Sequence, residues 1–197
     1  MFLFIIISFY LYTFAVTETP DIKAIELLNE KKFEYSDEIT NQRYFILIDY
    51  SKSILQKRLW LYDTQKDTVV IHCYVSHAFY SGIIYASDFS NQHGSNKTPK
   101  GAFITGDSYN GKFGYSMRLH GLEKGINEHS YKRYITFHPC CKWFWSEGCF
   151  MTDRATSKKI IDLTKNGSFM YVYAKSPKPI LKNYLISYFI SRFLIAK

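Results

Sequence analysis

The feature that most constrains the fold is the stretch GAFITGDSYNGKFGYSMRLHG, residues 101–121. It places Asn110-Gly111 between two segments in which apolar and polar residues alternate. Alternation with a period of two is typical of β-strands, and Asn-Gly favours the positive φ angles of a type I′ turn. The stretch therefore predicts a β-hairpin that turns at Asn110-Gly111.

The rest of the chain predicts a mostly β fold with a few short helices. Its 17 Tyr and 16 Phe in 197 residues favour pleated, half-buried strands. Helical spacing of apolar residues predicts a helix over 21–35, and a second is expected after Thr152 or Asp153 as N-cap, with Gly167 just past its end. The Ser-, Asn- and Gly-rich residues 81–101 predict a long loop. Strands are expected at RYFILIDYS, KRLWLYD, TVVIHCYVSH, RYITFH and SFMYVYA, the first three as a β-meander.

Two apolar segments flank the expected domain. Residues 1–17 carry no charged side chain before position 18, which is typical of a signal peptide or an N-terminal anchor, so we expect an exported protein. Residues 18–42 form a helical lead-in, and 43–175 form the main domain. Residues 176–197 predict an apolar helix with cations near its ends. It could lie at a membrane surface or dock on the domain.

The formal net charge of +8 favours an anionic partner, such as nucleic acid, acidic lipid or a carboxylate-bearing cell-wall polymer. The 25 Lys and Arg are scattered, and no nucleic-acid motif accompanies them, so we expect no nucleic-acid partner. With 47% apolar and 21% charged residues, the composition excludes wholesale disorder.

The chain has four cysteines, Cys73, Cys140, Cys141 and Cys149, and no C-x-x-C pair. A disulfide scaffold and a zinc ribbon are therefore both disfavoured. A zinc set of His138 with the last three cysteines is also disfavoured, because adjacent cysteines rarely point at one tetrahedral centre. We expect no metal and no cofactor. Cys73 lies in an apolar strand and is interpreted as a small buried hydrophobe.

The stretch TFHPCCKWFWSEGCF carries the candidate chemistry. A strand ends at His138, and a loop returns to Gly148-Cys149 just before a helix. Nucleophilic cysteine chemistry needs a thiolate, a base and donors for the oxyanion, and this arrangement could supply all three. From spacing alone, a buried Cys149 beside a structural His138 fits equally well.

Residues 44–173 resemble the murein L,D-transpeptidase catalytic domain family. The similar pieces follow the family's order: the opening hairpin, then VSHAFYSG, the Thr98-Pro99-x-Gly101 turn, MRLHGLE, RYITFH and the Ser-x-Gly-Cys signature, here SEGC. The resemblance implies an L,D-transpeptidase-like β-sandwich of mixed sheets. It covers about two thirds of the chain.

The resemblance also implies roles for particular residues. Cys149 matches the nucleophile and His138 the imidazole that activates it. The flanking signature positions are Ser146 and Gly148. Residues that match the substrate cleft and the loop beside it are Arg118, His120, Gly121, Ser95 and Pro99. His77 and His120 could line the cleft, or each could equally be a hydrogen-bonded histidine at a strand end. Cys140 and Cys141 could be spare thiols or disulfide partners of Cys149.

The implied activity is acyl transfer on peptidoglycan stem tetrapeptides. Cys149 would form a thioester, release D-alanine and pass the acyl group to an amine of a neighbouring stem. Two alternatives remain open at this point. Water as acceptor would make the protein an L,D-carboxypeptidase, and an inactive thiol would leave a cell-wall or membrane-binding module.

Overall fold

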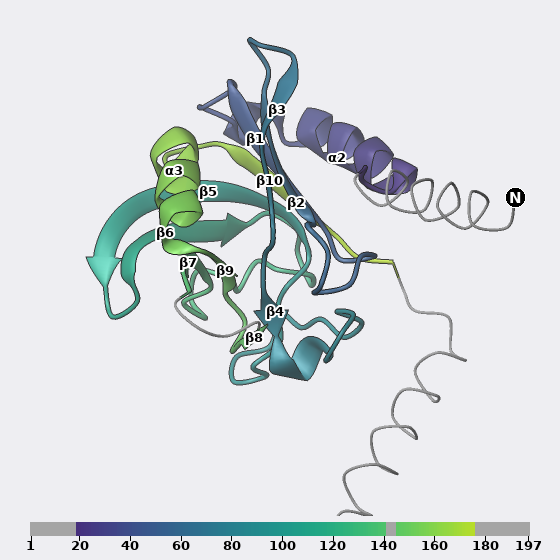
Figure 1. The fold of residues 1–197 in the computed structure, drawn as a ribbon, viewed down its shortest axis with the longest axis vertical. Helices are drawn as coiled ribbons and strands as arrows, with labels where there is room; N and C mark the ends of the chain where they lie inside the picture. The colour runs from purple at the N-terminus through teal and green to yellow at the C-terminus, as the bar shows by residue number, and fades with distance from the viewer. Residues whose placement is uncertain (1–18, 141–144, 176–197) are drawn as a thin grey trace, which may run out of the picture.

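A computed structural model describes residues 19–140 and 145–175 of the 197-residue chain. Figure 1 shows a strongly curved sheet with one long helix on its outer side. The helices are α2 (Ile22–Glu34) and α3 (Arg154–Thr164), with short 3-10 turns η1 (Ser36–Glu38) and η2 (Phe79–Ser81). The strands are β1 (Tyr44–Asp49), β2 (Leu59–Asp63), β3 (Thr68–Cys73), β4 (His77–Ala78), β5 (Gly101–Gly111), β6 (Gly114–Gly121), β7 (Thr136–Pro139), β8 (Trp145–Ser146), β9 (Phe150–Thr152) and β10 (Phe169–Tyr173).

Eight strands form one mixed sheet in the order β3-β2-β1-β10-β5-β6-β7-β9, and β4 pairs with β8 in a second, two-stranded sheet. The predicted meander is confirmed, because β1, β2 and β3 pair antiparallel in sequence order. The last strand, β10, runs parallel to β1 and antiparallel to β5, so it joins the meander to the hairpin. The mostly β class with mixed strand directions and short helices is thus confirmed.

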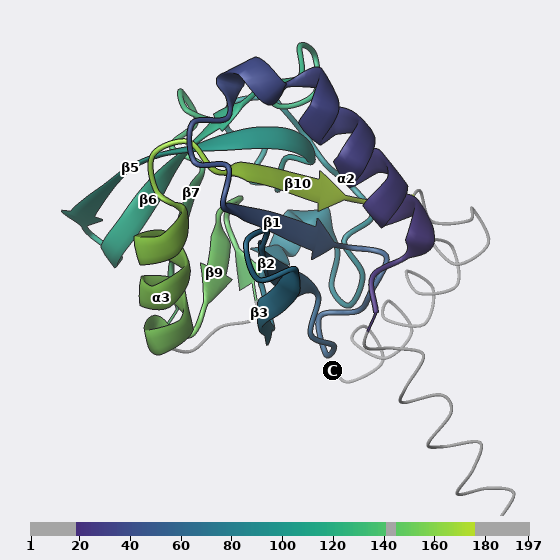
Figure 2. The same ribbon diagram turned by 90° about the horizontal axis from the view of Figure 1, so that it is seen from above.

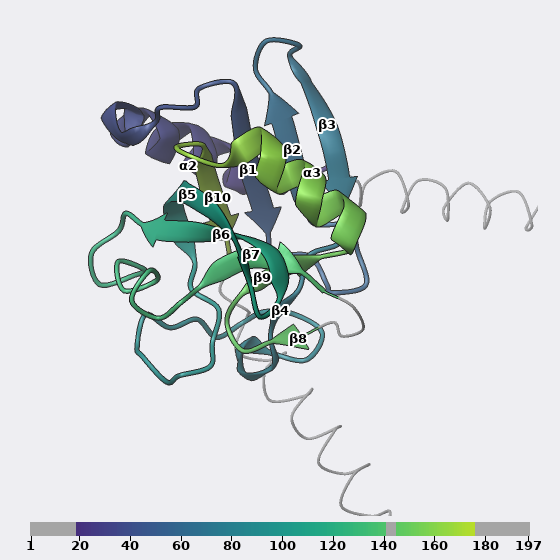
Figure 3. The same ribbon diagram turned by 90° about the vertical axis from the view of Figure 1, so that its left-hand side faces the viewer.

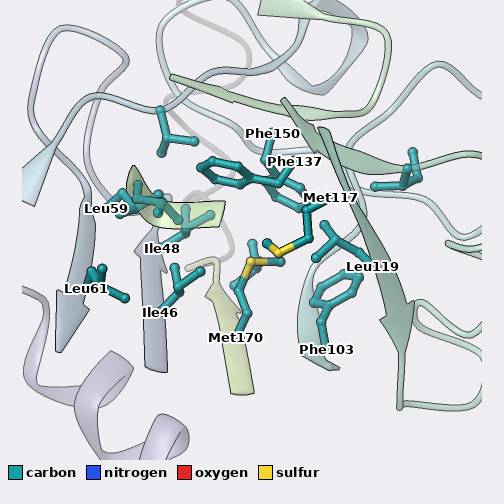
Figure 4. Packing of buried hydrophobic residues seen from close by; sticks show 14 of the residues in the cluster. Ile46, Ile48, Leu59, Leu61, Phe103, Met117, Leu119, Phe137, Phe150 and Met170 are labelled. Carbon is teal, nitrogen blue, oxygen red and sulfur yellow. The ribbon is translucent and has the colours of Figure 1, made fainter. Parts of the chain in front are cut away.

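The curvature brings the two halves of the sheet around one core. Figure 4 shows side chains from both halves meeting there, with Ile46 and Ile48 of β1 facing Met117, Leu119 and Phe137 of the other half. Ile160 and Ile161 of α3 are fully buried in the same cluster. Burying this many apolar side chains provides the main stabilisation of the fold.

The two expected helices are confirmed, and each covers a different face. Helix α2 begins after Asp21, whose carboxylate accepts a hydrogen bond from the Lys23 amide, and lies on the outer face of β1 and β10 (Figure 2). Its buried Ala24 and Leu28 pack in a second apolar cluster there. Helix α3 begins after Asp153, one of the two expected N-caps, and its carboxylate accepts from the Thr156 amide.

The predicted hairpin exists, but its turn lies two residues further along than Asn110-Gly111. Gly111 pairs with Gly114, so Lys112 and Phe113 form the loop. Neither Asn110 nor Gly111 has a positive φ, whereas Gly114 has φ +86°. A glycine in the left-handed region directly after a two-residue turn is the arrangement of a turn followed by a bulge. The predicted position of the turn, Asn110-Gly111, is therefore wrong, because Gly114 supplies the positive φ for a turn two residues later.

Strands β6, β7 and β9 bury one face and direct the other away from the core. Phe137 pairs with Phe150, and both are fully buried in the core cluster. Since side chains alternate along a strand, Thr136, His138 and Cys149 belong to the opposite face. Figure 3 shows that the loops around β4 and β8 lie beside this edge of the sheet.

Both predicted terminal segments, 1–17 and 176–197, lie outside the described residues. Within residues 19–140 and 145–175, no helix has the length and apolar character that membrane crossing requires.

Candidate active site

A short turn, Ser146 to Cys149, presents the candidate nucleophile at the start of β9. The Ser146 hydroxyl accepts a hydrogen bond from the Gly148 amide at 3.2 Å and donates one to the Cys149 carbonyl at 2.6 Å. Gly148 has φ +134°, and a Cβ there would lie 2.7 Å from Ile135 Cδ1. Only glycine tolerates that conformation without strain, so the signature residues define the backbone path into Cys149.

A second segment holds the nucleophile from the other side. Ser76 donates its amide to the Met151 carbonyl at 2.9 Å, and its hydroxyl accepts from the Met151 amide at 3.0 Å. The same hydroxyl lies 3.5 Å from the Cys149 carbonyl. Tyr50, itself buried, donates its hydroxyl to the Ser76 carbonyl at 2.6 Å. Cys149 is therefore fixed between two independently anchored segments.

The thiol of Cys149 is half-buried and has two hydrogen-bond partners from the adjoining strand. The Thr136 hydroxyl donates to the sulfur at 3.7 Å, and the thiol donates to the Tyr134 carbonyl at 3.6 Å. Phe137 of β7 pairs with Phe150 of β9, and the two strands are parallel. The residues that precede this pair, Thr136 and Cys149, therefore lie opposite each other. A sulfur that accepts a hydrogen bond is better able to carry negative charge.

His138 lies on the same face of the sheet as Cys149. On β7 it is two residues beyond Thr136, the residue opposite Cys149. Strand geometry separates the Cα atoms of His138 and Cys149 by about 8 Å. In the part of the chain that the structure describes, no hydrogen bond joins the two side chains. The ring stacks on Phe113 with centroids 4.5 Å apart, and its Nδ1 lies 2.9 Å from the Pro139 carbonyl. Because a carbonyl only accepts, Nδ1 carries the proton and Nε2 is the basic nitrogen.

The electrostatic environment favours a neutral pair. Burial raises the pKa of the Cys149 thiol, against hydrogen bonds from Thr136 and the charge of Arg133, which lower that pKa. Burial lowers the pKa of His138. At neutral pH the ground state is therefore a thiol beside an imidazole that can accept its proton, which is the protonation state that a general base requires.

Arg118 and His120 lie on β6 on the same face of the sheet as Cys149. Arg118 pairs with Thr136, so it stands at the level of Cys149 two strands away. Its guanidinium lies 4.5 Å from the Tyr109 ring centroid and 5.5 Å from that of Tyr131, and His120 stacks on Tyr131 at 4.7 Å. These contacts form a cationic and aromatic platform on the same sheet face as Cys149, two strands away from it.

The remaining predicted cleft residues have different surroundings. Ser95 accepts a hydrogen bond from Arg133 at 3.1 Å, so the loop that carries Ser95 is tied to the residues before β7. Pro99 is buried. A Cβ at Gly121 would lie 2.0 Å from the Asn127 carbonyl oxygen, so this glycine permits a close backbone approach.

Several residues at this site were not singled out from the sequence, among them Thr136 and Arg133. Thr136 sits inside an apolar strand, and its polar contact with Cys149 arises only from the β7–β9 register. Arg133 is one of 25 Lys and Arg scattered along the chain. A sequence signal for Arg133 was its place at the start of the strand that ends in His138.

Among the described cysteines, Cys73 and Cys149 are free thiols. Cys73 is only partly buried, in place of the full burial expected, because it packs at the margin of the core cluster. Burial nevertheless raises its pKa to about 12. Cys140 lies four residues beyond Thr136, about 13 Å along the strand, whereas a disulfide requires Cα atoms within about 7 Å. Cys140 therefore cannot bridge to Cys149 in this conformation, and Cys141 lies outside the described residues. Among the described residues, no three His, Cys, Asp or Glu side chains gather as metal ligands.

A family profile described as the L,D-transpeptidase catalytic domain matches residues 18–173. The chain belongs to this family. The match spans most of the chain and includes α2. A search of curated protein sequences found no match.

Solved structures share this fold at low identity. The helical cell shape determining protein Pgp2 of Campylobacter jejuni is similar, with a TM-score of 0.50 and 13% identity over 70% of this chain and 49% of that one. The Enterococcus faecium L,D-transpeptidase gives 0.43 and 14% over 67% and 50%, and the Ldtfm–avibactam carbamoyl enzyme gives 0.45 and 13% over 68% and 50%. This chain spans about half the length of each of these three proteins.

Proposed function

We propose that this protein is a peptidoglycan L,D-transpeptidase that acts through a thioester on Cys149. The observation that carries the proposal is the anchored Ser146–Cys149 turn. It presents a thiol on the same sheet face as a neutral imidazole and an arginine platform. Membership of the L,D-transpeptidase catalytic domain family gives this arrangement its reaction class.

In the first half-reaction, His138 Nε2 takes the proton of the Cys149 thiol as the sulfur attacks the carbonyl before the terminal D-alanine. The C–N bond breaks, the protonated imidazole returns a proton to the leaving amine, and D-alanine departs. A covalent thioester remains, which divides one difficult amide exchange into two easier steps. The distance of His138 from Cys149 has to shorten in this step, as is common for catalytic hydrogen bonds on substrate binding.

In the second half-reaction, an amine of a neighbouring stem peptide attacks the thioester. Its proton passes to His138, the C–S bond breaks and the thiol is restored as the cross-link forms. Arg118 is suited to hold a stem-peptide carboxylate, because guanidinium and carboxylate pair in a bidentate geometry. His120, Ser95, Gly121 and Pro99 are proposed to line or shape the same cleft.

We further propose an exported protein that meets its substrate in the cell envelope. Residues 1–17 are proposed as the leader or anchor that directs export. Residues 18–42 are proposed as a lead-in and residues 43–175 as the catalytic domain. The membrane contact expected of residues 176–197 falls on a segment outside the described residues.

The test uses reduced protein without residues 1–17, incubated with tetrapeptide muropeptides, beside the Cys149→Ala variant. Mass spectrometry of the products should reveal a cross-linked dimer with loss of D-alanine from the wild type and nothing from the variant. Tripeptide without dimer would identify a carboxypeptidase instead. No product from the wild type would contradict both activities and favour a binding module.

A further inference from the structure

Arg133 is held in one position by three acceptors from the loop that precedes β5. Its guanidinium donates to the carbonyls of Ser90 and Lys97, the latter at 2.7 Å, and to the Ser95 hydroxyl at 3.1 Å. The side chain is half-buried. Within the described residues, no carboxylate lies within 4 Å of it, although six other ion pairs form there. Arg133 is therefore a fixed cation without an acidic partner among these residues.

Two contacts bring this cation beside the nucleophile. The position that a Cβ of Gly148 would occupy lies 3.8 Å from Arg133 Nη2, and Gly148 directly precedes Cys149. The next residue in the chain, Tyr134, accepts a hydrogen bond from the Cys149 thiol through its carbonyl at 3.6 Å. The absence of a side chain at Gly148 leaves the guanidinium facing the backbone of the nucleophile's turn.

Two charged groups act on the Cys149 thiol, and two more charged or titratable side chains lie on the same face of the sheet. Arg133 lowers the pKa of the thiol, and Glu147, which is exposed on the same turn, raises it. His138 lies two residues along on β7, and Arg118 stands two strands away on β6. The interaction between Arg133 and Cys149 is mutual, since it also raises the pKa of Arg133 against the effect of burial.

We propose that Arg133 is the positioning residue that makes the Cys149 thiol ionisable, by placing a permanent positive charge behind Gly148. A guanidinium stays protonated when half-buried, so its charge does not depend on the protonation of His138. The same group anchors the loop of Ser95, and this couples the reactivity of the thiol to the placement of that loop. The inference rests on the proposed function insofar as it assigns Cys149 as the nucleophile.

The test measures alkylation of reduced protein by iodoacetamide as a function of pH, and follows the Cys149 peptide by mass spectrometry. The thiolate is the reacting form, so the profile reports the thiol pKa. Removal of the charge in Arg133→Met should raise the midpoint by about one pH unit, and so slow alkylation near neutral pH about tenfold. Arg133→Lys keeps the charge but replaces the planar guanidinium fork by a compact ammonium, and it should stay near the wild type.

A variant that removes a negative charge, in place of a positive one, provides a matched control. Glu147→Gln removes an exposed negative charge from the same turn and should lower the midpoint. An unchanged midpoint in Arg133→Met would overturn the proposal. Equal shifts in the Met and Lys variants would also overturn it, because they would indicate loop anchoring in place of charge. The assay needs no substrate, so its outcome is independent of whether cross-linking is observed.

Discussion

The hydroxyl of Ser146 closes the turn that carries the candidate nucleophile. It accepts from the Gly148 amide and donates to the Cys149 carbonyl, so it satisfies two backbone groups of a three-residue excursion. A residue that acts in this way positions the nucleophile without touching the bond being broken. A hydroxyl can make both bonds because it donates one hydrogen bond and accepts others.

Ser146→Ala should lower the rate of Cys149 alkylation and of turnover, and should reduce the free energy of unfolding by about 1–2 kcal/mol, because two hydrogen bonds are lost. Ser146→Thr, which keeps the hydroxyl, is the control and should retain most of both rates. Alkylation kinetics and urea unfolding measure the two effects. Equal losses in both variants would contradict a role for the hydroxyl.

At the scale of elements, the β5–β6 hairpin aligns Arg118 with Thr136 and hence with Cys149. Its register depends on the turn at Lys112-Phe113 and on Gly114 at φ +86°. A slip of one residue would move Arg118 to the core face and Met117 outward, because side chains alternate along a strand. The turn is therefore part of what builds the site.

Gly114→Ala should reduce the free energy of unfolding by about 1–2 kcal/mol, since an L residue is disfavoured at positive φ. A Cβ there would meet only Pro139 Cγ at 3.7 Å, so the effect comes from the backbone. Asn110→Ala, at an exposed position without positive φ, should change stability by less than about 0.5 kcal/mol. Urea unfolding of both variants checks this, and a larger loss for Asn110→Ala would restore the turn expected from the sequence.

Local patterns sufficed for the elements but not for their assembly. Helix α3 and its N-cap Asp153 follow from residues close together in the chain. The insertion of β10 between β1 and β5, and the contact of Thr136 with Cys149, depend on pairings between distant segments. Ser146, Gly148 and Cys149 were located only because they form a contiguous signature. Arg133 lies outside that signature, and its importance arises from the loop it binds and the glycine it faces.

For the whole molecule, a buried polar network connects the meander to the segment that supports the nucleophile. Arg58 is fully buried and donates to the Val75 carbonyl and to His77 Nδ1, the latter at 2.7 Å. His77 Nε2 then donates to the Gly82 carbonyl at 2.8 Å. Because Nδ1 must accept from a cation, the ring has to stay neutral, and burial together with Arg58 lowers the pKa of His77 to about 3.

This network predicts acid sensitivity. The unfolded chain takes up a proton on His77 near pH 6.5, whereas the folded protein does so only near pH 3. Stability should therefore fall as pH drops below about 6.5, by up to about 1.4 kcal/mol per pH unit from this group. His77→Gln, whose amide oxygen can accept from Arg58, should flatten that slope between pH 6 and about 4.5, as measured by urea unfolding at several pH values.

His93→Gln serves as the matched control, because it makes the same exchange at an exposed position of the long loop. If both variants retained the wild-type slope, His77 would not be the titrating group.

The central claim is that Cys149 carries the acyl group, and the most direct test is to trap that intermediate. Reduced protein mixed briefly with a tetrapeptide muropeptide and quenched in acid should gain the mass of the muropeptide less D-alanine. Peptide mapping should place the adduct on Cys149 and remove it on treatment with hydroxylamine. An adduct on Cys140 or Cys141, or D-alanine release from a Cys149→Ala variant, would contradict the account.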